Sequence, residues 1–379
     1  MKYDIQKKYL SQFSEQEQSI IKAASIIRDI NFDLWSPAAG VTNIYSQTQY
    51  VDPNGLLPLS LKQMQKLKYW YRAIDILDKQ HFKNGVPIVA DQITGYEIKQ
   101  QSVGDCSVLC SLAVTAHHEF KHHHKIRLIS GNIYPQDQYQ NPIYNPEGKY
   151  IVKLYLNGSW RGVEVDDYLP VNEWGQLICA YSNKSKLWVS LIEKAYLKAH
   201  GGYDFDGSNS SRDLFVLTGW LPEIIKLKEY DREKLWTRIS NGYKNRDCLI
   251  TCGTGPIEDE DKVGLVSGHA YAILEIMEYD GLRMLLVKNP WGHLCYKGKF
   301  SVNDQKNWTA ARKQAFGFKN LEVMDNGIFW IDIDTFCNAY ENLYINWNPQ
   351  LLAYRKSFFD LWKEAEMSHN NYISVKKNP

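Results

Sequence analysis

The chain has 379 residues, of which 44% are hydrophobic, and its formal net charge at pH 7 is +1. This length and apolar content suffice to bury a sizeable core in about two domains. The near-zero net charge gives no reason to expect nucleic acid or a charged membrane surface as a partner. No apolar run approaches the ~20 residues of a transmembrane helix, so we expect no membrane span.

Two helices are predicted in the first part of the chain. Residues 14 to 29 carry apolar side chains at helical spacing, and Ser14 with Glu17 forms a capping-box pair at the start. This helix could dock a partner, but packing on its own domain is the commoner role. A second helix is expected to start after Ser60 and to run toward Leu77.

A third helix is predicted to begin at or beside Cys106, because apolar residues follow it at helical spacing. The unpaired N–H groups and the dipole at a helix N-terminus favour a thiolate, which is the nucleophilic form of cysteine. The alternative is a buried structural cysteine. The apolar positions are Val108, Leu109, Leu112, Ala113 and Ala116.

The same helix carries His118, Glu119 and His122 in the H-E-x-x-H pattern of zinc proteases. The pattern lies in a histidine-rich clump and no third ligand follows from spacing, so we favour a solvated helix end. It also lies about three to four turns from Cys106, too far to share that site.

The next elements are predicted to form scaffold and core. Residues 151–156 and 159–165 flank Asn157-Gly158, a pair typical of a type I′ hairpin turn. Apolar residues from Leu187 to Ala195 then predict a helix that Gly201-Gly202 ends.

Beyond Gly219 the pattern changes to short β-runs, at residues 248–252, 270–276, 284–287 and 328–331. Cys248 and Cys252 lack the second ligand pair of a zinc site. The acidic run 258–261 lacks the spacing of an EF-hand loop and is expected to be a solvated loop or, less simply, a mobile flap at a cleft.

A histidine and an asparagine are predicted to meet in this β-rich part. His269 precedes the strand at 270–276 and Asn289 follows the strand at 284–287, so a hairpin would bring both to the same end. An Asn carbonyl that accepts the imidazole N–H fixes the tautomer of a base, as the third member of a catalytic triad does.

These residues together resemble the protease core of the calpain family, and most of all its atypical PalB-like branch. Gln100 stands six residues before Cys106, which ends a Gly-Asp-Cys motif, and the likeness covers about residues 60 to 348. The matching stretches are Gly268–Tyr271, Lys288–Gly292, Leu187–Tyr196, Gly201–Phe205, Gly207–Ser210 and Leu217–Trp220.

The resemblance implies a papain-like α+β fold with a helix-rich cysteine lobe and a β-rich His/Asn lobe. It implies Cys106 as nucleophile, His269 as base, Asn289 as its orienting partner and Gln100 as an oxyanion donor. It also implies that Trp291 shields the His–Asn contact, with ordinary packing as the alternative role. We expect an N-terminal helix and connector at 1–60, the cysteine lobe at 61–218, the His/Asn lobe at 219–348 and a tail at 349–379. Ser107 stands where most calpains carry Trp. The PalB-like branch resembles this chain in that respect, so we do not interpret Ser107 as inactivating.

Calcium is the point at which the family pattern breaks. The positions that match one core calcium site are Ala90 and Gln92, through backbone oxygens, with Glu97 and Asp204. The acidic positions of the second site fall on Cys295, Val302, Asn326 and Ile328, which removes nearly all its anionic ligands. We therefore expect no required cofactor and at most a weak calcium response through one site.

The sequence thus predicts an intracellular cysteine endopeptidase that makes limited cuts in proteins. The alternative is a calpain-like binding scaffold that acts with membrane-remodelling (ESCRT-type) machinery, as the PalB-like resemblance implies. The N-terminal repeats and C-terminal C2-like domains usual in that branch have no room here, so we expect a fragment or a minimal form. The seven cysteines, odd in number and without a signal peptide before them, favour a reducing cytoplasm.

Overall fold

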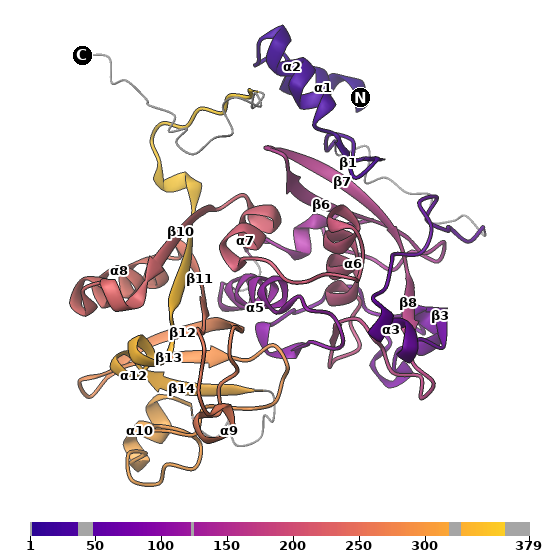
Figure 1. Cartoon of the computed structure of the whole chain (residues 1–379). Helices are drawn as coiled ribbons and strands as arrows, with labels where there is room; N and C mark the ends of the chain where they lie inside the picture. The colour runs from indigo at the N-terminus through magenta and orange to yellow at the C-terminus, as the bar shows by residue number, and fades with distance from the viewer. Residues whose placement is uncertain (1, 37–47, 123–124, 318–326, 361–379) are drawn as a thin grey trace, which may run out of the picture.

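A helical lobe and a β-sheet lobe meet along one central helix, α5 (Cys106–Lys121), in the computed structural model (Figure 1). The structure describes residues 2–36, 48–122, 125–317 and 327–360. Almost every side chain of α5 after Cys106 is buried, from Ser107 to Glu119. The helix is therefore the common core element of both lobes.

The first lobe surrounds α5 with two helices and a long hairpin. The predicted type I′ hairpin is confirmed: β6 (Lys149–Leu156) and β7 (Ser159–Asp166) pair across Asn157 and Gly158, whose φ angles are 46° and 76°. The predicted helix α6 (Trp188–His200) ends at Gly201, at φ 107°. The lobe also contains α7 (Ser210–Thr218), β4 (Ile98–Lys99), β5 (Ile133–Tyr134), β8 (Tyr168–Val171), β9 (Tyr181–Ser182) and the 3₁₀ turns Lys79–His81, Gly95–Glu97 and Ser130–Asn132.

The helix expected from Ser60 toward Leu77 was wrong in its length. The chain forms α3 (Leu61–Lys66), then β3 (Tyr69–Arg72), then the short α4 (Ala73–Ile76). The aromatic segment Tyr69–Arg72 pairs along its whole length with β8, so a long-range strand pairing overrides the local helical pattern.

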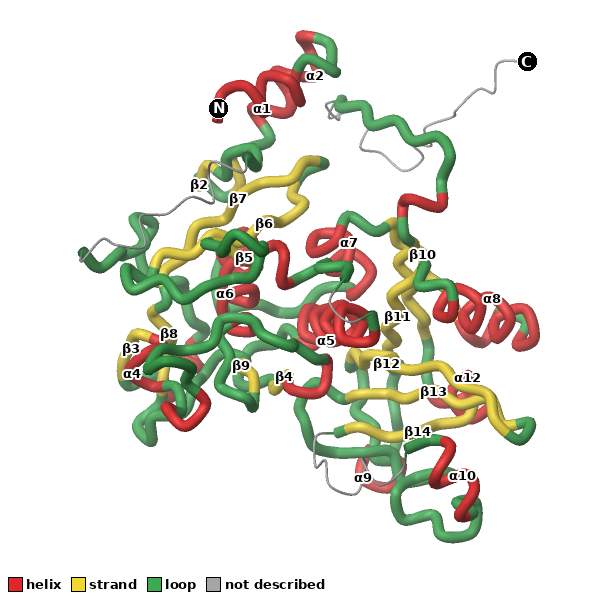
Figure 2. Tube along the Cα trace, turned by 180° about the vertical axis from the view of Figure 1, so that it is seen from behind, coloured by secondary structure: helices red, strands yellow, loops and turns green. Residues whose placement is uncertain are grey.

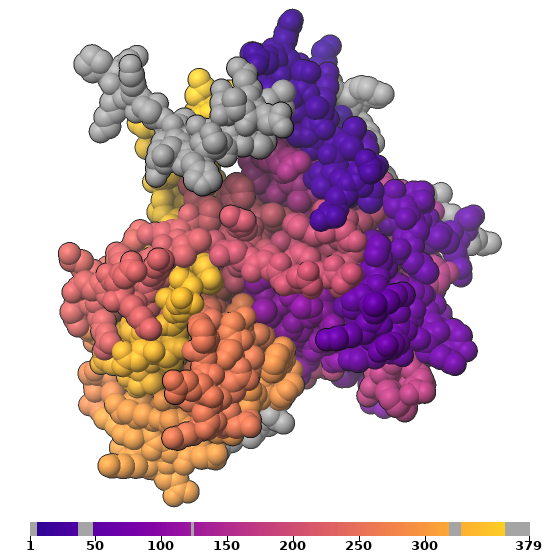
Figure 3. Space-filling model, viewed as in Figure 1, coloured from indigo at the N-terminus to yellow at the C-terminus, as the bar shows by residue number. Residues whose placement is uncertain are grey.

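The N-terminal helix was also predicted too long. Its capping box between Ser14 and Glu17 is present, but α2 (Glu15–Ala23) stops six residues before the expected end. The preceding helix α1 (Lys2–Leu10) was not predicted, and the strands β1 (Ile26–Ile27) and β2 (Ile30–Asn31) follow α2. These elements lie on the first lobe, away from the second (Figure 3).

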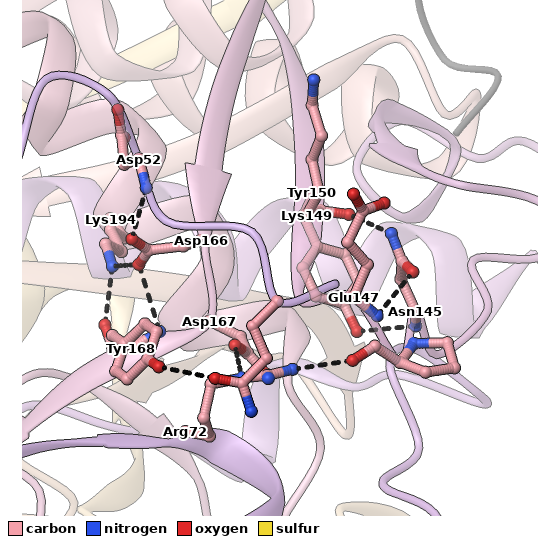
Figure 4. A network of polar contacts seen from close by, with 12 residues as sticks. Asp52, Arg72, Asn145, Glu147, Lys149, Tyr150, Asp166, Asp167, Tyr168 and Lys194 are labelled. Atoms are coloured by element: carbon pink, nitrogen blue, oxygen red, sulfur yellow. Dashed lines mark hydrogen bonds and ion pairs between the residues drawn. The ribbon is translucent and has the colours of Figure 1, made fainter. Parts of the chain in front are cut away.

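Buried ion pairs attach the early chain to this lobe. Arg72 pairs with Asp167 and Lys194 pairs with Asp166, as Figure 4 shows, and Lys198 Nζ lies 2.5 Å from the Asp52 carboxylate. Charges this deeply buried are tolerated only when paired, because an isolated buried charge is strongly unfavourable. The pairs thereby fix the connector and β3 against β7 and α6.

The second lobe is built on a six-stranded antiparallel sheet of order β10-β15-β11-β12-β13-β14. One sheet face packs on α5, as Figure 2 shows for β12, and the other on α8 (Arg232–Lys244) and α12 (Ile333–Ala339). The strands are β10 (Leu221–Lys226), β11 (Cys248–Gly253), β12 (Ala270–Tyr279), β13 (Leu282–Lys288), β14 (Ile328–Asp332) and β15 (Asn342–Trp347), with the short helices α9 (Glu260–Val263) and α10 (Ala310–Ala315) and the 3₁₀ turns Leu227–Glu229 and Pro349–Leu351 beside them.

The lobes share one apolar interface. Ala270, Ala272 and Leu274 of β12 belong to the core that surrounds α5, whereas the alternate residues Tyr271 and Ile273 face the outer core. Division of the chain at residues 60, 218 and 348 stays a prediction. None of the helices in the described part of the chain is long and apolar enough to cross a membrane.

Candidate active site

Cys106 is the first residue of α5, as the sequence predicted, and it is partly exposed. Its backbone N–H precedes the first intrahelical hydrogen bond and so remains available as a donor. Gly104 lies so close to the segment after α6 that a Cβ there would stand 2.8 Å from the Phe205 carbonyl oxygen. The backbone that carries the thiol is therefore tightly packed.

The thiol of Cys106 is less acidic than its helix position alone predicts. Burial raises its pKa, and the carboxyl of Asp105 raises it further, while hydrogen bonds from the Ala270 and Ser107 N–H groups favour the thiolate. Desolvation outweighs the effect of the helix N-terminus here, so the thiol needs a proton acceptor to become a thiolate. The Ala270 contact also places the sulfur beside the residue that follows His269.

The predicted hairpin of β12 and β13 brings His269 and Asn289 together. The pairing of Ala272 with Lys288 puts both residues at the same end, and His269 Nε2 lies 2.9 Å from Asn289 Oδ1. The Asn289 Nδ2 group donates to the carbonyl of His293 at 3.1 Å, which leaves Oδ1 facing the imidazole. Nε2 thus carries the proton in the neutral imidazole, and Nδ1 is free to accept one.

His269 is buried, and burial lowers its pKa to about 4 although Asn289 favours the charged form. Its ring centroid lies 4.7 Å from that of Trp291, so the indole packs against the imidazole. A neutral imidazole can accept the proton of a protonated thiol when the two groups meet.

Gln100 lies between the lobes, and its side chain is committed in part. The backbone N–H of Gln100 donates to the Pro290 carbonyl at 2.9 Å, which links the first lobe to the loop after Asn289. Its Nε2 donates to the Val103 carbonyl at 2.8 Å, and its Oε1 is buried without a hydrogen-bond partner. The Gln100 Nε2 group also donates to Asp105 Oδ1 at the longer distance of 3.5 Å, and this is the contact that a substrate oxygen would replace.

A buried carboxyl pair behind the nucleophile was missed by the sequence analysis. Asp105 and Glu193 are both fully buried and hydrogen-bonded to each other. Burial raises the pKa of Asp105 to about 7 and that of Glu193 well above its usual value, so the pair holds a proton near neutral pH. No sequence spacing links the two residues, because helix packing alone brings them together.

We expect the Asp105–Glu193 pair to contribute stability that decreases as the pH rises. The unfolded chain releases this proton above about pH 4, whereas the folded chain keeps it up to about pH 7, so the contribution of this pair to stability is largest below about pH 4 and is lost as the pH rises through 7. Glu193→Gln removes one carboxyl, and we expect a smaller decline of the urea midpoint between pH 5 and 8. Glu229→Gln, on an exposed carboxylate, is the control, and an equal change in both variants would contradict the assignment.

The competing motifs have structural roles. Glu119 accepts hydrogen bonds from Ser130 N and Oγ at 2.9 and 2.7 Å, so it anchors a turn. His118 and Glu119 are buried, and the expected solvated helix end was therefore wrong. Cys248 and Cys252 are buried strand residues. Among the described residues no group of three or more His, Cys, Asp or Glu side chains could hold a metal ion.

The acidic run is partly helical. Asp259 caps α9, and the Glu260 carboxylate accepts the Ser267 N–H at 2.7 Å, two residues before His269. All four residues of the acidic run are exposed to solvent, as predicted. A flap role stays a hypothesis.

The residues that match a calcium site do not fit the ion. Lys186 Nζ lies 3.0 Å from Glu97 Oε2 and donates to the Gln92 carbonyl at 3.1 Å, so an ammonium takes both oxygens. Asp204 is exposed. Calcium needs six to eight oxygen ligands and would be repelled by the ammonium. These residues therefore do not form a calcium site in this arrangement.

A partly exposed cysteine at the N-terminus of a helix, and a His–Asn pair at the end of the β-hairpin that packs on this helix, form the arrangement of a papain-like α+β cysteine protease. The family model "Calpain family cysteine protease" matches residues 51–346. The chain belongs to the calpain family, whose substrates are proteins.

Its relatives include calpain-7 of Homo sapiens, with 42% identity over 339 residues. The alignment covers 87% of this chain and 41% of that protein. The calpain-like protease palB/RIM13 of Aspergillus oryzae is 33% identical over 360 residues, which cover 92% of this chain and 40% of that protein. The chain thus spans about two fifths of the length of these relatives.

Proposed function

We propose that this chain is a cysteine endopeptidase whose triad is Cys106, His269 and Asn289, with Gln100 as oxyanion donor. The observation that carries the proposal is the 2.9 Å contact between His269 Nε2 and Asn289 Oδ1. It fixes the tautomer that directs the proton-accepting nitrogen of His269 away from Asn289. The Ala270 N–H at the sulfur supports the same arrangement from the side of Cys106.

The reaction proceeds in two halves. The Cys106 proton moves to His269 as the sulfur attacks the substrate carbonyl carbon, and the oxyanion is held by the Cys106 N–H and the Gln100 amide. Collapse breaks the peptide C–N bond, the imidazolium gives its proton to the leaving amine, and a thioester remains. His269 then takes a proton from water, which attacks the thioester, and Cys106 recovers its proton as the carboxylic acid leaves.

We propose further that the reaction requires no calcium, because Lys186 takes the matching oxygens. A scaffold role with membrane-remodelling partners is the alternative, and it is one of the outcomes of the test.

The test is alkylation of the native chain with a peptidyl epoxide that traps activated thiols, followed by mass spectrometry. Cys106 and Cys295 are partly exposed and the other five cysteines are buried, so exposure alone predicts similar rates for these two. We expect Cys106 to react about 100-fold faster than Cys295 at pH 7, equally with calcium and with a chelator. Equal rates for both thiols, or alkylation only with calcium, would overturn the proposal and favour the scaffold or a metal-gated enzyme respectively.

A further inference from the structure

Lys186 connects two neighbouring loops of the first lobe, whose backbones also meet where Asn183 N donates to Glu97 O at 2.8 Å. It lies just before α6, and its ammonium reaches the loop of residues 90–97, where it contacts Gln92 O and Glu97 Oε2. The Lys186 side chain is 13% exposed and that of Glu97 is 3% exposed. The ion pair is thus shielded from solvent, unlike a typical surface salt bridge.

The backbone of the loop needs this contact. Gln92 has a φ of 45°, in the left-handed region that a non-glycine residue rarely adopts. Such a conformation persists when surrounding contacts hold it, and the ammonium holds the Gln92 carbonyl. The remaining oxygen of Glu97 accepts hydrogen bonds from Thr94 N and Trp188 Nε1, at 3.1 and 3.0 Å.

The loop leads directly to the active site. Gly95 is packed so closely on α5 that a Cβ there would stand 2.4 Å from the Ala113 carbonyl oxygen. Glu97 is followed by β4 and then by Gln100, whose N–H donates to Pro290 of the second lobe. A shift of the loop would therefore move Gln100 relative to both Cys106 and the His–Asn pair.

We propose that the Lys186 ammonium is a built-in cation that replaces a metal ion in this loop and holds Gln100 and the two lobes in the catalytic arrangement. Lys186 is a positioning residue for the proposed protease, and this inference rests on that function. The ammonium supplies three donors and one positive charge, which match one carbonyl and one carboxylate. Because this cation is covalently part of the chain, the arrangement of the loop does not depend on the concentration of a metal ion.

The test compares three variants with the wild type. Lys186→Met removes the charge and keeps much of the length, Lys186→Arg keeps a cation, and Lys184→Met changes an exposed lysine of the same loop as a control. For Lys186→Met we expect Cys106 alkylation to slow by about 10- to 100-fold, because small misplacements of catalytic groups have effects of this size. We expect Lys186→Arg to retain much of the rate and Lys184→Met to retain all of it.

Hydrogen–deuterium exchange provides a readout that does not depend on activity. In Lys186→Met we expect faster exchange in peptides that cover residues 90–100, with exchange of the hairpin β6–β7 unchanged. In the wild type, addition of calcium should leave exchange at residues 90–100 unchanged.

Any of three outcomes overturns the inference. The first is that Lys186→Met keeps the wild-type rates of Cys106 alkylation and of exchange at residues 90–100, and the second is that Lys184→Met slows alkylation as much as Lys186→Met. The third is that calcium slows exchange at residues 90–100 in the wild type. Failure of the proposed function looks different, because the wild type itself would then show no selective alkylation of Cys106. If Lys186→Met unfolds, exchange will be fast in the hairpin as well, and a retained fold and alkylation rate in Lys186→Arg would still support the requirement for a cation.

Discussion

Replacing His269 with alanine is expected to make the alkylation of Cys106 steeply dependent on pH. In the wild type, burial holds the pKa of His269 at about 4, so the imidazole can accept the thiol proton throughout the range above it. The alkylation rate should rise through about pH 4 and then stay nearly constant to about pH 8. Because the thiol and the imidazole exchange a proton, the apparent pKa values in this profile belong to the Cys–His pair and not to either residue alone.

Without the imidazole the rate follows the thiol itself. Burial raises the Cys106 pKa above its usual value, so no more than about 1 to 3% of the thiol is ionised at pH 7. We expect His269→Ala to be about 100-fold slower at pH 7, with a rate that rises about tenfold per pH unit toward pH 9. Peptide hydrolysis should fall by about 10³-fold or more, because general acid catalysis is lost as well.

The measurement is the rate of epoxide alkylation by mass spectrometry at six pH values from 4 to 9. His81→Ala changes an exposed histidine outside the site and serves as control. A His269→Ala profile that keeps the wild-type plateau would show that another group takes the thiol proton.

The parts of the fold that could be predicted are those that neighbouring residues determine. Asn157-Gly158 specifies its turn, Gly201 ends α6, and the apolar spacing after Cys106 sets the start of α5. The hairpin of β12 and β13 follows from two apolar runs and a turn, and it alone is enough to bring His269 to Asn289. Local patterns therefore predicted both halves of the candidate site.

The features that could not be predicted depend on contacts between distant segments. Tyr69–Arg72 becomes a strand only because β8 is available to pair with it. Asp105 meets Glu193 through helix packing, and Lys186 reaches Glu97 across 89 residues of sequence. The resemblance to calpains identified the oxygens around Lys186, but only the structure shows which cation they hold.

Replacing Gln100 with alanine is expected to separate hydrolysis from alkylation. Peptide hydrolysis develops a negative oxygen that the Gln100 amide would stabilise, and loss of one such donor typically lowers kcat by about 10²- to 10³-fold with little change in KM. Epoxide opening by Cys106 forms no tetrahedral oxyanion, so its rate should stay within about threefold of the wild type.

This comparison tests whether the Gln100 amide serves the reaction or the fold. Its hydrogen bond to Val103 O at 2.8 Å stabilises the turn before Cys106, so a structural role is a real competitor. If that role dominates, Gln100→Ala will misplace Cys106 and slow alkylation and hydrolysis together. Gln100→Glu keeps the size but removes the donors at neutral pH, and a loss of kcat at constant alkylation in both variants would assign the amide to the oxyanion. Equal loss of both reactions would assign it to the turn and leave the Cys106 N–H as the oxyanion donor.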